Sequence, residues 1–126
     1  MFRKLLLIDL WVLRIAGTAA LILGLVIWAG YAQNLLHTHI VLGGLVVLAL
    51  WGVCLAALIR KASAPLAIVG IIWGVLVLWL GMKQMTLMPG SMHWLIRVVH
   101  LLLGLGAMGL GEALVGKIKR AASSLG

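Results

Sequence analysis

The sequence is short of charged residues, and of acidic residues above all. Of its 126 residues, two are Asp or Glu and ten are Lys or Arg, and charged residues together make up 10% of the chain. Hydrophobic residues make up 65%, and the mean hydropathy is +1.27. Soluble domains carry roughly 25% charged residues, which they need to face water. The composition therefore excludes a soluble globular domain.

Cysteine is nearly absent as well. The single Cys54 excludes an intrachain disulfide, and its apolar neighbours predict inert packing. Asp9 and Glu112 are the only acidic residues, and no nucleophile, base and orienting acid form a hydrolytic pattern. The sequence also has no phosphate-binding loop.

Long apolar runs are what the sequence has instead. Runs of about 20 residues can cross a bilayer as helices. Four such runs lie at about 10–32, 36–59, 65–88 and 93–116. The short connections make consecutive helices antiparallel neighbours. We predict an all-α integral membrane protein, with residues 1–126 forming a single four-helix transmembrane domain in contact with the lipid bilayer.

The basic residues gather on one side of this predicted bundle. Three clusters fall before the first run, between the second and third, and after the fourth: Arg3 and Lys4; Arg60 and Lys61; Lys117, Lys119 and Arg120. Such an excess marks the cytoplasmic side. We therefore predict an inner-membrane protein with cytoplasmic termini and a periplasmic or extracellular histidine-rich side. The net charge of +8 is mainly topological, so nucleic acid is not an expected partner.

A short pattern occurs twice. A histidine is followed at i+4 by a glycine at His39 and Gly43, and again at His100 and Gly104. Upstream of each histidine a W-x-G-x-x-Q pattern ends in Gln33 or Gln84. Residues at i and i+4 share one helix face. We interpret the repeat as two duplicated helical hairpins that bring His39 and His100 face to face.

Facing histidines in a helical bundle are a known arrangement for binding haem. Two imidazoles can ligate one iron from opposite sides, and glycines leave space for the ring. We predict haem b with iron ligands His39 and His100, beside Gly43 and Gly104. Polar groups at the outer rim would meet the haem propionates: Arg97, His93, Gln33, Gln84 and Lys83.

The choice of histidine pair has alternatives. Counted from the predicted helix starts, His100 lies several ångströms deeper than His39, and His39 with His93 is the alternative pair. His37 with His93 is a candidate pair for a second haem or a metal near the outer surface.

The four predicted spans, with His39, His100 and their glycines, resemble four-helix bis-histidine membrane cytochromes b such as the cytochrome b561 group. This resemblance implies one-electron transfer through bound haem. Electron transfer is therefore favoured over catalysis, and an oxidoreductase activity stays open. Members of that group often hold two histidine pairs, whereas this chain has no histidine in its predicted cytoplasmic half. We therefore expect a haem near the outer face rather than a complete transmembrane wire. A quinol, a periplasmic redox protein or superoxide would be the electron partner.

Copper is the alternative ligand. Thioether and imidazole groups bind copper, and several lie between the third and fourth runs or close to the second: Met82, Met85, Met88, Met92, His93, His37 and His39. A third interpretation is a structural or assembly protein without a cofactor. Its glycines, including Gly70 and Gly74 in a G-x-x-x-G spacing, would serve helix packing or a homodimer.

Four charged residues fall inside the apolar runs, and two of them, Arg14 and Glu112, lie away from the predicted outer rim. Arg14 lies in the first run and Glu112 in the fourth, both towards the cytoplasmic side. Charged side chains in a membrane need partners or a route to the interface. We expect Arg14 to pair with Asp9 or Glu112, or to reach the headgroups. Glu112 would pair with Arg14 or with the lysines that follow it, or serve a proton path.

Overall fold

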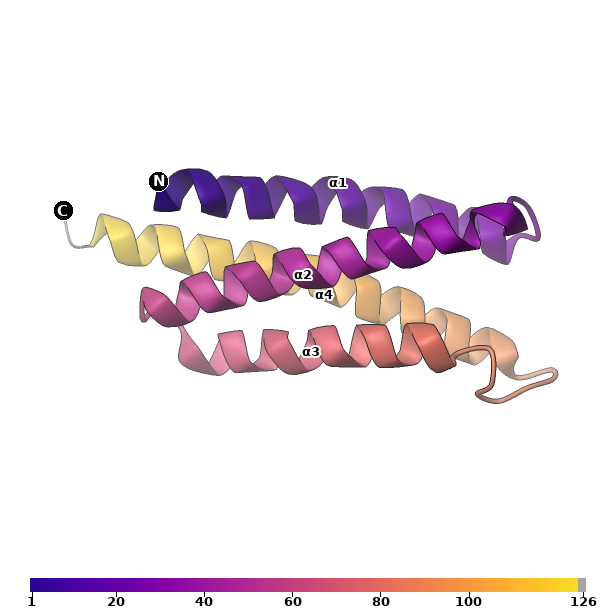
Figure 1. The fold of residues 1–126 in the computed structure, drawn as a ribbon. Helices are drawn as coiled ribbons and strands as arrows, with labels where there is room; N and C mark the ends of the chain where they lie inside the picture. The colour runs from indigo at the N-terminus through magenta and orange to yellow at the C-terminus, as the bar shows by residue number, and fades with distance from the viewer. Residues whose placement is uncertain (125–126) are drawn as a thin grey trace.

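The computed structural model describes residues 1–124, and all regular structure in this range is helical. Four long helices form a bundle, with one short 3-10 helix between the first two (Figure 1). The elements are α1 (Phe2–Trp28), η1 (Gln33–Leu35), α2 (Leu36–Ile59), α3 (Ala64–Lys83) and α4 (His93–Ser123). Each of the four long helices is long and apolar enough to cross a membrane, which confirms the predicted fold class at this level.

Helix α1 is displaced from the predicted run at both ends. It begins at Phe2 rather than near residue 10, because its first turns pack against the bundle and bury Leu6 and Leu10. It ends at Trp28 rather than near 32. Gly30 has a φ of +93° and Ala32 a φ of +51°, and this left-handed backbone stops a right-handed helix.

Helix α3 is shorter than predicted and α4 is longer. α3 ends at Lys83 instead of 88, and both the backbone N–H and the hydroxyl of Thr86 donate to the Lys83 carbonyl. Pro89 disfavours the helical conformation for the residue before it, and Met88 has a φ of +45°. α4 continues past 116 to Ser123, because Ile118 is still buried there.

Helices α2 and α4 cross each other, and α1 and α3 lie on either side (Figure 1). The N-terminus and the end of α4 lie at the same end of the bundle, which we call the terminal end. The opposite end carries η1 and the connection between α3 and α4, and we call it the histidine end. The two hairpins are therefore α1–α2 and α3–α4.

Most of the core lies in the terminal half of the bundle, and along α3 it extends to Val77. Leu13, Leu50 and Leu114, from three different helices, have no exposed surface. In α2 the buried residues begin at Val46, and in α4 they begin at Ala107. The first turns of both helices, at the histidine end, therefore contain no fully buried residue, although Leu42 and Leu103 pack against the edge of the core.

Glycines set how closely the helices approach in the core. A Cβ at Gly70 would meet the sulfur of Cys54, and a Cβ at Gly74 would meet the ring of Trp51. The G-x-x-x-G spacing of α3 therefore receives side chains of α2 within the same chain. Gly111 of α4 receives the side chain of Leu13 in the same way.

An ion pair links α1 and α4 beside this core. Arg14 Nε and Nη2 donate to the Glu112 carboxylate oxygens over 2.5 Å and 3.0 Å. This confirms Glu112 as the partner of Arg14. The Arg14 guanidinium also lies 5.4 Å from the centre of the Trp11 ring. The two-bonded geometry satisfies both charged groups on an otherwise apolar helix seam.

We predict opposite effects for two alanine substitutions in α4. Gly111→Ala places a methyl group against Leu13 and should lower stability by about 1–3 kcal/mol, as overpacking does. Gly109→Ala is the control, because no atom lies within 4 Å of its Cβ position and alanine favours helix by about 1 kcal/mol. Thermal unfolding in detergent measures both. Equal midpoints for the two variants would contradict the close α1–α4 contact.

Candidate functional site

A cavity of about 210 Å³ lies between the two hairpins at the histidine end, lined by all four long helices and by Gln33 of η1. Most of the cofactor-binding residues predicted from the sequence line it: His39, His93, His100, Arg97, Gly43, Gly104, Gln33 and Gln84. They come from α2, α4, η1 and the residue that follows α3. The structure thus gathers in one place residues that are far apart in the sequence.

His39 and His100 face each other in this cavity. Their ring centroids are 6.2 Å apart, with 70° between the ring planes. His39 is the fourth residue of α2 and His100 the eighth of α4, so their depths differ if counted from the helix starts. Because α2 and α4 cross (Figure 1), the two rings nevertheless meet. The pair that the repeat indicated is the pair that the fold brings together.

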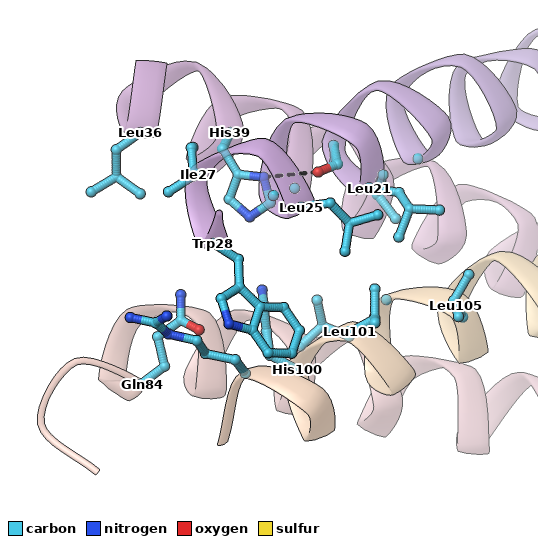
Figure 2. Close-up of a pocket in the computed structure, with 18 of the residues that line it drawn as sticks. Leu21, Leu25, Ile27, Trp28, Leu36, His39, Gln84, His100, Leu101 and Leu105 are labelled. Carbon is cyan, nitrogen blue, oxygen red and sulfur yellow. Dashed lines mark hydrogen bonds between the residues drawn. The ribbon is translucent and has the colours of Figure 1, made fainter. Parts of the chain in front are cut away.

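The ring of His39 is held by α1. Its Nδ1 lies 3.0 Å from the carbonyl oxygen of Ala20, a distance typical of a hydrogen bond (Figure 2). If Nδ1 carries the proton and donates, Nε2 is left with a free lone pair. A backbone carbonyl on Nδ1 is the usual way to fix the tautomer and direction of a metal-binding histidine.

Each histidine ring rests against a glycine of the other helix in its hairpin. A Cβ at Gly24 would lie 2.9 Å from Cε1 of His39, and a Cβ at Gly81 would lie 3.1 Å from Cε1 of His100. A side chain at either position would push the ring away. The sequence did not reveal either role, because residue spacing within one helix does not say which residues of a neighbouring helix it contacts. The duplication of the hairpins stays a prediction, although this packing is the same in both.

Gly43 and Gly104 have a different role. No atom lies within 4 Å of the Cβ position of either one, and both line the cavity. Their missing side chains therefore leave open space beside the two histidines. This is the placement that the sequence pattern predicted for them.

A polar rim closes the outer part of the cavity. Gln33 donates from Nε2 to the Ile27 carbonyl over 2.8 Å, and Nδ1 of His93 lies 3.2 Å from the Leu87 carbonyl. Arg97 lines the same cavity, whereas neither acidic residue of the chain does. The cavity therefore has a cation and no carboxylate to balance it.

Apolar side chains that sequence reasoning did not single out form the rest of the wall. Trp28 projects into the cavity (Figure 2). Leu25 of α1 and Leu105 of α4 also line it, yet they are 46% and 44% exposed. The cavity therefore reaches the outer surface of the bundle between α1 and α4. Met108, packed against Gly17, lies where this opening ends.

The methionine cluster predicted for copper is not gathered at this site. Met85 lines the cavity, but Met82, Met88 and Met92 do not, and they are largely exposed. His37 is also exposed and lies outside the cavity wall, so it does not join His93 there. Among residues 1–124 no three His, Cys, Asp or Glu side chains are grouped to hold a metal ion. The cluster that looked helical from its spacing falls mostly in the turn after α3.

Comparisons with protein-family models, with curated proteins and with solved structures found no match to this chain.

The two kinds of glycine at the site should respond differently to alanine. Gly24→Ala places a methyl group against His39 and should shift the ring nitrogen signals of that histidine in a ¹⁵N NMR spectrum. Gly43→Ala, the control in the neighbouring helix, should leave the ring in place because its Cβ position is free of contacts. Unchanged His39 signals in the Gly24 variant would contradict the described contact between Gly24 and the His39 ring.

Proposed function

We propose that the chain is an integral-membrane b-type haem protein, with His39 and His100 as the two iron ligands, and that it carries single electrons. One observation supports this most directly: the two rings face each other at 6.2 Å across a cavity that two glycines leave open. Two facing histidines on separate helices are also the feature that underlies the resemblance to bis-histidine membrane cytochromes b.

The ring separation suits one iron between the two histidines. An imidazole nitrogen lies about 2 Å from a transition metal that it binds, so nitrogens on opposite sides of one iron lie about 4 Å apart. The ring centroids lie behind these nitrogens and are then about 6 Å apart. The observed distance of 6.2 Å between the centroids is close to this spacing.

The charge of the cavity supports an anionic ligand. Arg97 is partly buried at the polar rim and has no acidic residue beside it in the cavity wall, so a ligand carboxylate would be a favourable partner for its charge. The carboxylates of haem would balance it, and Gln33 and Gln84 could donate further hydrogen bonds to them. A copper ion would add positive charge near Arg97, so the same observation disfavours the copper alternative.

Trp28 has to move to admit a ligand as large as haem. The cavity of about 210 Å³ is smaller than the roughly 300–1,000 Å³ of pockets that hold drug-sized molecules. Trp28 projects into it from the last residue of α1, and the chain beyond bends at Gly30 and Ala32. Rotation of this one side chain enlarges the cavity on the side where α1 and α4 leave it open.

In this proposal the protein residues hold the haem and tune it. Bound haem supplies a reversible one-electron change at its iron. His39 and His100 would hold its iron from opposite sides, an arrangement suited to one-electron transfer. The positive charge of Arg97 would favour the reduced, less positive state. The leucines around the histidines keep water from the site, which strengthens this effect.

The bundle is oriented in the proposed membrane by its charges. Seven of the ten cations lie near the terminal end, which the positive-inside rule places in the cytoplasm. The histidine end then faces the periplasm or the cell exterior. The opening between α1 and α4 gives lipid-soluble molecules, such as a quinol, an approach to the site from the bilayer.

Reconstitution with haem tests the proposal. The purified protein should take up about one haem and show a sharp Soret band with low-spin α and β bands on reduction. Gly104→Leu should keep the thermal midpoint but lose haem, since leucine fills the open space. Gly109→Leu, on the same helix and also free of contacts, should bind haem normally. No Soret band in the unmodified protein would overturn the proposal, and bound copper lost on replacing Met82 and Met85 would favour the copper alternative.

The angle between the ring planes gives a second, spectroscopic prediction. Nearly perpendicular axial imidazoles leave the iron d orbitals nearly degenerate, so the ferric protein should give a highly anisotropic low-spin EPR signal. The 70° angle between His39 and His100 predicts this type of signal. A rhombic signal typical of parallel imidazoles would mean that the rings turn when haem binds.

A further inference from the structure

The two facing histidines are held unequally. Nδ1 of His39 has the carbonyl oxygen of Ala20 at 3.0 Å. Nδ1 of His100 is buried and has no hydrogen-bond partner among the described residues. It is the one buried side-chain nitrogen or oxygen atom in this part of the chain that lacks a partner.

An equivalent acceptor exists for His100 but is not used. Ala20 lies four residues before Gly24, the glycine under the His39 ring, and Val77 lies four residues before Gly81, the glycine under the His100 ring. Ala20 and Val77 both line the cavity. Nevertheless His100 makes no hydrogen bond to the Val77 carbonyl, although His39 makes the corresponding bond. The two histidines therefore differ in whether Nδ1, the ring nitrogen that would not bind the iron, has a hydrogen-bond partner.

This difference has a chemical consequence for a metal ligand. A hydrogen bond to the second ring nitrogen fixes the direction of the imidazole and makes it a stronger donor. Loss of such a bond typically weakens metal binding by about 10–100-fold. Building on the proposed haem site, we propose that His39 is the permanent axial ligand and His100 an exchangeable one, so that a small neutral diatomic molecule can bind on the α4 side.

The surroundings of His100 fit such a ligand. Leu101 and Leu105 beside it are apolar and line the cavity, whereas the polar groups lie at the rim. Gly104, one turn along α4, leaves open space at its Cβ position for a displaced ring or a small molecule. In the exchange the bond between iron and His100 breaks and a bond from iron to the diatomic molecule forms. The released nitrogen keeps its lone pair, and no electron is transferred.

Three histidine variants and carbon monoxide test this inference. Apo-protein in detergent is titrated with haemin, and each loaded protein is then reduced and exposed to carbon monoxide while its absorption spectrum is recorded. His39→Ala and His100→Ala remove the two ligands in turn. His37→Ala is the matched control, because His37 is exposed and lies outside the cavity.

The expected results are unequal. His100→Ala should retain haem at least about tenfold more tightly than His39→Ala, and its reduced form should bind carbon monoxide at once. The unmodified protein and His37→Ala should bind carbon monoxide more slowly, with a shifted Soret band. A loaded protein that ignores carbon monoxide, or equal losses of haem in His39→Ala and His100→Ala, would overturn this inference alone. The absence of a Soret band from every protein would overturn the proposed function and this inference with it.

Discussion

The crossing of α2 and α4 is the constraint on which the rest of the structure depends. Two straight helices that cross in contact at one level move apart on either side of it. At the terminal end, α1 packs on α4 and fills this space with Leu13 against Gly111. At the histidine end no helix enters the gap, and the facing walls carry glycine where larger side chains would close it. The cavity is thus a geometric result of the same packing that forms the core.

Glycine acts in three ways in this bundle, and its neighbours tell the ways apart. Gly70, Gly74 and Gly111 receive side chains and bring helices together. Gly24 and Gly81 lie against the Cε1 atoms of the two imidazole rings. Gly43 and Gly104 contact nothing at their Cβ positions and keep space open. Close packing at the first two groups of glycines and open space at the third together give the cavity its shape.

Much of this was predictable from the sequence, because apolar runs and charge clusters act over whole helices. The four helices and the meeting of His39 with His100 followed from run length and the repeat, whereas the scarcity of charge left Glu112 as one of two candidate acidic partners for Arg14. Other features did not follow from the sequence, because they depend on how neighbouring helices are rotated. These are the contacts of the histidine rings with Gly24 and Gly81, the hydrogen bond to the Ala20 carbonyl and the position of Trp28. The spacing of the methionines wrongly suggested that they share one helix. Pro89 and the turn at Thr86 end α3 before most of that cluster.

The absence of acid near Arg97 links the composition to the proposed ligand. Both acidic residues of the chain lie towards the terminal end, where Glu112 is already bonded to Arg14. Arg97 therefore has to find its counter-charge in water at the rim or in a bound molecule, and a water-poor cavity favours the second. A neutral quinone offers no such charge, and a metal cation offers the wrong one. A flat apolar molecule with carboxylates at one edge satisfies the leucine walls, the facing histidines and the arginine together, and this combined requirement is the strongest argument for haem.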